Sequence, residues 1–131
     1  MTILLDGNVL IALLNSDHVH HRTARRWLVD LQENFATCPV TEGALARFAF
    51  RGGRTAEDVE QLLGMLAQHS RREFWPDSLP YDDVRFKGVI GHRQVTDVYL
   101  AQLARANSGR LATFDKGLAQ SHGDVAELIP T

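Results

Sequence analysis

Two kinds of apolar pattern alternate along this chain. Short apolar or β-prone runs predict strands at residues 2–5, 35–40, 73–76, 110–114 and 126–129. Between them, apolar residues recur every three or four positions, the spacing of a helix with one buried face. Helices are expected at residues 9–14, 17–32, 81–86 and 97–107, with further helices after Thr41 and Thr55. Because helices separate the strands, the pattern predicts an α/β fold with a mainly parallel sheet.

Capping residues set the expected limits of several helices. Thr41 and Thr96 are each followed by an acidic residue and are expected to be helix N-caps. Thr55 and Asp58 have the spacing of a capping box. Gly109 is the expected stop of the helix at 97–107.

Length and composition predict a single domain over residues 1–131. Hydrophobic residues make up 44% and charged residues 23% of the chain, as in ordinary globular proteins. Cys38 is the single cysteine, so no internal disulfide can form and a reducing compartment is expected. Asp6 and Asn8 interrupt the first apolar run, which argues against a signal peptide, and no run is long enough to span a membrane. We therefore expect a cytoplasmic protein.

The charge balance argues against a protein that binds nucleic acid over its whole surface, because such a protein would be basic. Fourteen Lys and Arg residues face sixteen Asp and Glu residues, which leaves a formal net charge of −2. Such a chain either does not bind nucleic acid or binds it locally, with clustered acids offsetting the basic groups. Arg22, Arg25 and Arg26 make a basic helix face that is either simply solvated or in contact with RNA phosphates.

Four carboxylates distant in sequence have related positions. Asp6 and Asp115 directly follow predicted strands, and Glu42 and Asp97 lie in the first turns of predicted helices. In a parallel sheet, strand ends and helix starts meet at one edge, where ligands usually bind. The four acids could therefore converge in space.

Converging carboxylates need a cation or must partly protonate. Unit charges about 4 Å apart interact by roughly 4 kcal/mol at an effective dielectric near 20. The ion that suits oxygen ligands is Mg²⁺ or Mn²⁺. Such an ion lowers the pKa of bound water and neutralises phosphate, so phosphodiester hydrolysis is the expected reaction class.

Each acid also has an ordinary structural explanation. Glu42 and Asp97 could be ordinary residues of a helix start. Asp115 could lie in a turn, and so could Asp6, which precedes Gly7 and Asn8. A carboxylate that directly follows a buried apolar run is costly unless it is used or paired, so Asp6 favours a functional role.

The combination resembles the PIN-domain family, and in particular VapC-type toxins. The opening strand and helix of that family are similar to LLDGNVLIALL, and its second helix is similar to DHVHHRTARRWL. The family's Thr-Glu pair is matched by CPVTEGALARF. Its most characteristic stretch is matched by HRQVTDVYLAQLARANSGRLATFDKGLA. The resemblance covers nearly the whole chain in the same order, and residues 54–87 match only in general character.

This resemblance implies a three-layer α/β/α fold and an endoribonuclease that depends on Mg²⁺ or Mn²⁺. Asp6, Glu42, Asp97 and Asp115 match the family's acidic quartet. Asp6 and Asp97 would be the chief metal ligands, and the other two would ligate more weakly, hold a second ion or orient water.

Three polar residues beside the quartet also match the family. The resemblance implies that Asn8 and Thr113 hydrogen-bond the acids. It implies that Arg93 lies near the substrate path.

The resemblance also implies partners. The family forms homodimers, pairs with a small VapB-type antitoxin that covers the active site, and cuts structured RNA such as tRNA or rRNA. Two alternatives stay open: a PIN-domain nuclease of RNA processing outside toxin–antitoxin systems, and a non-catalytic module that binds a basic segment in its acidic pocket. A receiver-type phosphorylation domain fits less well, because Asp6 stands alone where such domains place paired acids.

Overall fold

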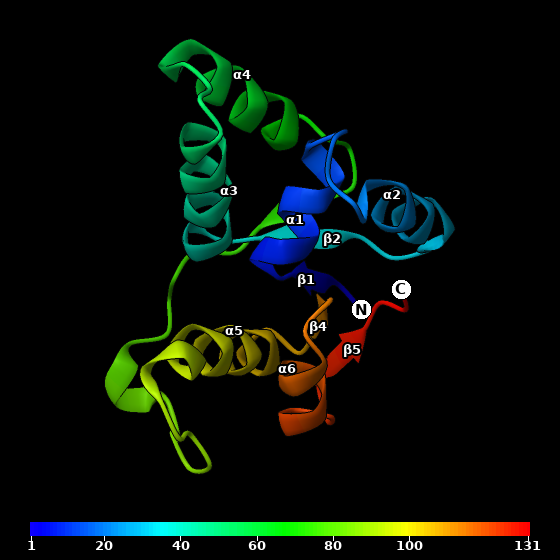
Figure 1. The fold of residues 1–131 in the computed structure, drawn as a ribbon. Coiled ribbons are helices and arrows are strands. Elements are labelled where there is room, and N and C mark those ends of the chain that lie inside the picture. Colours follow the sequence, from blue (N-terminus) through cyan, green and yellow to red (C-terminus); the bar gives the residue numbers. More distant parts are fainter.

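A parallel five-stranded sheet forms the centre of the molecule in the computed structural model, which describes residues 1–131 (Figure 1). Its strands are β1 (Ile3–Leu5), β2 (Phe35–Thr37), β3 (Arg72–Phe74), β4 (Arg110–Thr113) and β5 (Ala126–Leu128). They lie in the order β3-β2-β1-β4-β5, and all neighbours pair in parallel. This order confirms the predicted α/β class.

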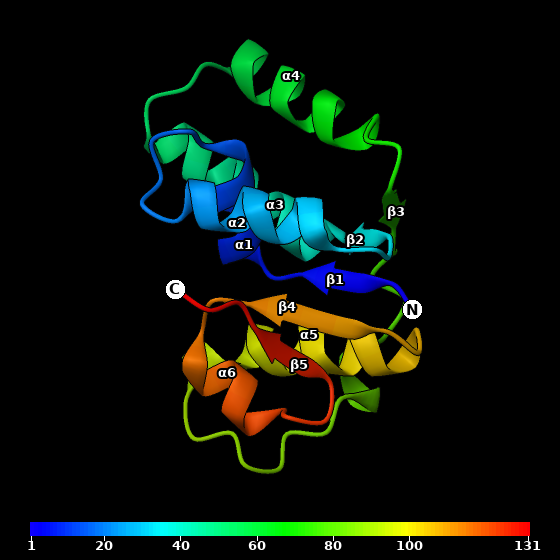
Figure 2. The same cartoon turned by 90° about the vertical axis from the view of Figure 1, so that its right-hand side faces the viewer.

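Helices cover both faces of the sheet, so the molecule has three layers (Figures 1 and 2). One face carries α1 (Gly7–Leu14), α2 (His21–Asp30), α3 (Pro39–Arg51) and α4 (Ala56–Ala67). The other face carries α5 (Val95–Ala106) and α6 (Lys116–Ser121). The connection between β3 and α5 contains two 3₁₀ turns, Tyr81–Asp83 and His92–Gln94. No helix is both long enough and apolar enough to pass through a membrane.

The two faces of the sheet have separate apolar cores. Ile3 and Leu5 of β1 pack with residues of α1, α3 and α4. Leu4, which points to the opposite face, packs with residues of α5 and α6. Strand side chains alternate between faces, so a strand buried on both sides reads as a continuous apolar run. That is why β1 was recognisable in the sequence.

Two expected helix starts are wrong. The helix expected at 17–32 begins only at His21, because residues 16–20 form turns in which the His18 Nδ1 accepts a hydrogen bond from the His20 N–H at 3.0 Å. Thr41 is not an N-cap: α3 begins two residues earlier at Pro39, whose fixed φ suits a first helical position. Thr41 lies in the first turn, and its hydroxyl accepts from the Cys38 N–H.

The region before α5 also differs from expectation. Thr96 is not an N-cap, because the 3₁₀ turn His92–Gln94 runs directly into α5, which begins at Val95. The expected helix at 81–86 is only the 3₁₀ turn Tyr81–Asp83. In contrast, the capping box of Thr55 and Asp58 is confirmed, with both hydrogen bonds present.

Gly109 takes part in the helix stop expected there, because its N–H donates to the Ala104 carbonyl oxygen at 2.9 Å, and it also has a packing role. Ser108, with φ of 54°, takes the left-handed position that ends α5. A Cβ atom at Gly109 would lie 2.5 Å from the Thr2 carbonyl oxygen and 2.7 Å from the Trp75 ring. Only glycine therefore allows β4 to enter the sheet beside these groups.

Candidate active site

Asp6 is held at the end of β1 by the backbone and by β4. It is the N-cap of α1, and one carboxylate oxygen accepts from the Gly7 N–H at 2.7 Å. The other accepts from the Thr113 hydroxyl at 2.7 Å. Burial raises the pKa of Asp6 above its ordinary value, the two hydrogen bonds partly offset this, and the charge of Asp115 raises it further.

Thr113 joins Asp6 to Asp115. Its buried hydroxyl donates to Asp6 and accepts from the Asp115 N–H at 2.9 Å. Asp115 caps α6, and its carboxylate accepts from the Gly117 and Leu118 N–H groups. Thr113 therefore contacts the Asp6 side chain directly, as the family resemblance implied.

Asp97 completes a cluster of three carboxylates with Asp6 and Asp115, which we call the aspartate cluster. It lies in the first turn of α5, partly buried. Burial, and then the charges of Asp6 and Asp115, raise the pKa of Asp97 from 3.8 to about 6. The cluster thus concentrates negative charge without a direct ion-pair partner, because none of the three ion pairs in the protein includes these residues.

A pocket of about 450 Å³ opens beside the aspartate cluster. Asp97 and Asp115 line it together with Lys87 and Arg93. Both basic residues are exposed and form no ion pair. Arg93 therefore lines the same pocket as two of the acids, and its expected place near the substrate path stays a prediction. Lys87 adds a second cation that the sequence did not point to.

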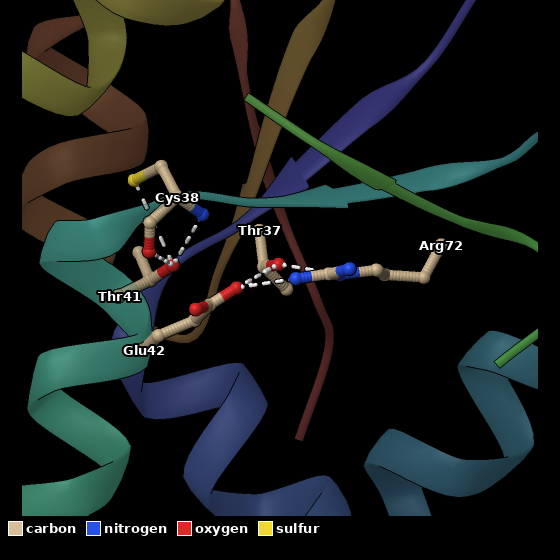
Figure 3. Close-up of polar contacts among 5 residues, drawn as sticks. All are labelled: Thr37, Cys38, Thr41, Glu42 and Arg72. Atoms are coloured by element: carbon tan, nitrogen blue, oxygen red, sulfur yellow. Dashed lines mark hydrogen bonds and ion pairs between the residues drawn. The ribbon is translucent and has the colours of Figure 1, made fainter. Parts of the chain in front are cut away.

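Glu42 is engaged elsewhere (Figure 3). Its Oε2 atom accepts from the Thr37 hydroxyl at 2.7 Å and from an Arg72 guanidinium nitrogen at 2.7 Å. The charges that raise the pKa values of Asp6 and Asp97 come from within the aspartate cluster. The structure thus groups three of the four candidate acids and pairs the fourth with Arg72.

Asn8 supports the backbone of the site. Its side-chain oxygen accepts from the Phe114 N–H at 3.3 Å, which ties the start of α1 to the end of β4. It holds the segment that carries Asp115, and no hydrogen bond joins it to an acid.

Arg72 is the site residue that sequence reasoning missed. It lies on the edge strand β3, thirty positions from Glu42 in sequence. No spacing or motif signals the contact, which arises from the pairing of β2 with β3.

The donor atoms of the aspartate cluster suit a hard divalent cation. Carboxylate oxygens are the ligands that Mg²⁺ and Mn²⁺ prefer, and the charges of neighbouring carboxylates help to raise the pKa values of Asp6 and Asp97. In the conformation described, no group of three or more Asp, Glu, His or Cys side chains is arranged to hold a metal ion. An ion shared by the cluster would therefore require side chains to turn toward one another.

A basic surface lies next to this edge of the sheet. Arg22, Arg25 and Arg26 of α2 are exposed, and they line a shallow hollow of about 430 Å³. Figure 2 shows α2 beginning at the edge where β1 and β4 end. The His20 ring, just before α2, lies 5.1 Å from the Phe114 ring, which precedes Asp115.

Comparison with known proteins agrees with this architecture. Residues 3–122 match the family model of the PIN domain. Ribonuclease VapC29 of Mycobacterium tuberculosis is 56% identical over 131 residues, covering 100% of this chain and 98% of the relative. Ribonuclease VapC39 of the same species is 42% identical, covering 92% of this chain and 94% of the relative.

Two solved structures share the fold. The crystal structure of M. tuberculosis VapC20, described as a Sarcin-Ricin loop cleaving toxin, superposes with a TM-score of 0.74 at 15% identity, covering 98% of this chain and 99% of that one. VapBC2 from Rickettsia felis, bound to a DNA fragment from its promoter, gives 0.70 at 18% identity, covering 99% and 100%. The chain therefore belongs to the PIN-domain family and, within it, to the VapC-type ribonuclease toxins.

Proposed function

We propose that this protein is an endoribonuclease that depends on Mg²⁺ or Mn²⁺ and serves as the toxin of a toxin–antitoxin pair. The observation that carries the proposal is the aspartate cluster, in which the pKa values of Asp6 and Asp97 are raised and no carboxylate has an ion-pair partner. It occurs in a chain whose full-length relatives are named ribonucleases. Perturbed carboxylates beside a pocket are typical of a catalytic site.

Asp6 and Asp97 would hold the ion, with Asp115 as a weaker ligand. A bound divalent ion supplies an activated water and neutralises phosphate charge. The Thr113 hydroxyl holds the Asp6 carboxylate in place, and Asn8 holds the strand end that carries Asp115. Glu42 is the fourth acid of the proposed site, and it stays paired with Arg72.

RNA would reach the acids along basic surfaces. Lys87 and Arg93 line the pocket beside Asp97 and would contact phosphate oxygens. The α2 arginines form a second, separate positive surface that would also meet phosphates. Local basic patches around an acidic centre explain how a chain with net charge −2 can bind RNA.

The proposal includes partners. A VapB-type antitoxin would cover the acidic pocket, and two copies of the toxin would form a homodimer. A relative's solved structure with the same fold is a VapBC assembly, which supports an antitoxin partner. Structured RNA, such as tRNA or rRNA, is the proposed substrate.

The test is cleavage of total RNA by purified, antitoxin-free protein with Mg²⁺ or Mn²⁺ and with EDTA. Asp6→Asn keeps the size of the side chain and removes its charge, so it should reduce cleavage by a factor of about 100 or more. Glu60→Gln, at an exposed acid of α4, is the matched control and should cleave like the wild type. Full cleavage by folded Asp6→Asn, or cleavage that EDTA does not affect, would contradict the proposal.

If the folded wild-type protein cleaves none of the RNA pools tested, the result favours the alternative of a non-catalytic binding module. Binding of a basic peptide that is insensitive to EDTA would then identify that function.

A further inference from the structure

Glu42 forms an ion pair with Arg72 of the same chain. The Arg72 guanidinium donates to Glu42 Oε2 at 2.7 Å, and its Nε donates to the Thr37 hydroxyl at 3.1 Å. That hydroxyl donates in turn to the same Glu42 oxygen at 2.7 Å. The three side chains form a closed ring of hydrogen bonds (Figure 3).

The ring is largely shielded from water. The Arg72 side chain is 15% exposed and that of Glu42 is 23% exposed. The Arg72 guanidinium also lies 5.4 Å from the centre of the Phe74 ring, a cation–π distance. Breaking a shielded ion pair is costly, because it leaves an uncompensated charge on the partner, whereas an exposed pair separates easily. Glu42 is therefore held firmly at Arg72.

This contact divides the candidate acids into two electrostatic groups. Glu42 is neutralised by a residue of this chain, whereas the aspartate cluster has no ion-pair partner. A divalent ion gains most where negative charge is uncompensated, and a fixed guanidinium repels a second ion that approaches Glu42.

We propose that Arg72 is a positioning residue that keeps Glu42 from coordinating metal and takes the place of a second metal ion beside it. The inference rests on the proposed metal-dependent function. It predicts that the wild-type protein binds one divalent ion at the aspartate cluster, and that removal of the Arg72 charge frees Glu42 to bind a second ion.

Mn²⁺ binding to the purified, antitoxin-free protein tests this, measured by the EPR signal of free Mn²⁺ and by calorimetry. The wild type should bind one ion. Arg72→Gln should bind a second ion, or bind Mn²⁺ about tenfold more tightly, because a nearby positive charge is gone. Arg72→Gln combined with Glu42→Gln should return to one ion, and Arg72→Lys, which keeps the charge, should also bind one.

Arg110→Gln is a matched control, because it removes the arginine of another ion pair, with Glu127, that lies away from the cluster. It should bind one ion. Thermal unfolding checks the fold of every variant. If Arg72→Gln does not fold, Glu42→Gln alone decides: it should keep Mn²⁺ affinity within about threefold of wild type, whereas Asp6→Asn should lose binding.

Three results would overturn the inference. These are a folded Arg72→Gln protein with wild-type Mn²⁺ binding, a wild-type protein that binds two ions, and a Glu42→Gln protein as weak as Asp6→Asn. Failure of the proposed metal site is distinguishable, because the wild type would then show no Asp6-dependent Mn²⁺ binding at all.

Discussion

At the scale of single residues, Asp97 has the most strongly shifted pKa of the candidate site. Its pKa of about 6 lies above the ordinary value of 3.8 because of burial and then because of Asp6 and Asp115. A carboxyl with a raised pKa opposes folding when it ionises. The aspartate cluster therefore lowers the stability of the metal-free fold at neutral pH, as expected of a site shaped for a cation.

Ionisation of Asp97 should make the metal-free protein lose stability between pH 4.5 and pH 7.5 relative to a variant without this carboxylate. The folded state binds more protons than the unfolded state between the two pKa values of Asp97, so stability falls as pH rises from about 4 through about 6. The loss due to Asp97 is about 1–2 kcal/mol once solvent screening is allowed for. Urea unfolding in EDTA at several pH values measures it.

Asp97→Asn is the matched variant for that experiment. It cannot ionise, so it should flatten this part of the pH profile and unfold at higher urea than the wild type at pH 7.5. An Asp97→Asn profile that parallels the wild type would show that other groups cause the dependence.

At the scale of elements, α2 places three arginines on one exposed helix face beside the active edge. The Arg25→Gln/Arg26→Gln variant should weaken binding of single-stranded RNA, measured in EDTA so that no cleavage occurs. If both residues contact phosphates, the slope of log affinity against log salt should fall by about 1.4.

Arg47→Gln/Arg51→Gln removes the same charge from exposed positions of α3 and is the control for α2. It should leave the salt slope near that of the wild type. Equal slopes for the wild type and the α2 variant would show that this face is only solvated.

The elements also show where sequence reasoning failed. Short parallel strands were predictable because burial on both faces makes them continuous apolar runs, as at β1 and β4. Helix starts were predicted less well: the cap at Thr55 is confirmed, but Thr41 and Thr96 lie inside their helices. Pro39 starts α3 before Thr41, and a 3₁₀ turn starts α5 before Thr96.

At the scale of the whole molecule, a divalent ion should couple distant parts of the chain. Asp6, Asp97 and Asp115 belong to separate elements, so an ion held by them binds the folded state only. At a concentration of 100 times its Kd, Mn²⁺ should stabilise the fold by about 2.7 kcal/mol, which raises the melting temperature by several degrees.

Scanning calorimetry with Mn²⁺ and with EDTA measures this shift. Asp6→Asn should show little or no shift, whereas Glu60→Gln should match the wild type. A melting temperature that Mn²⁺ leaves unchanged would contradict a site shared by these elements.

The sequence by itself determined the α/β class and the positions of Asp6, Asp97 and Asp115 at strand ends and helix starts. Local periodicity and the meeting of these ends at one edge of a parallel sheet are enough for that inference. Only the tertiary structure decided that Thr113 joins Asp6 to Asp115 and that Glu42 pairs with Arg72. Those contacts depend on which strands lie side by side, β1 with β4 and β2 with β3, and strand order leaves no mark in local sequence pattern.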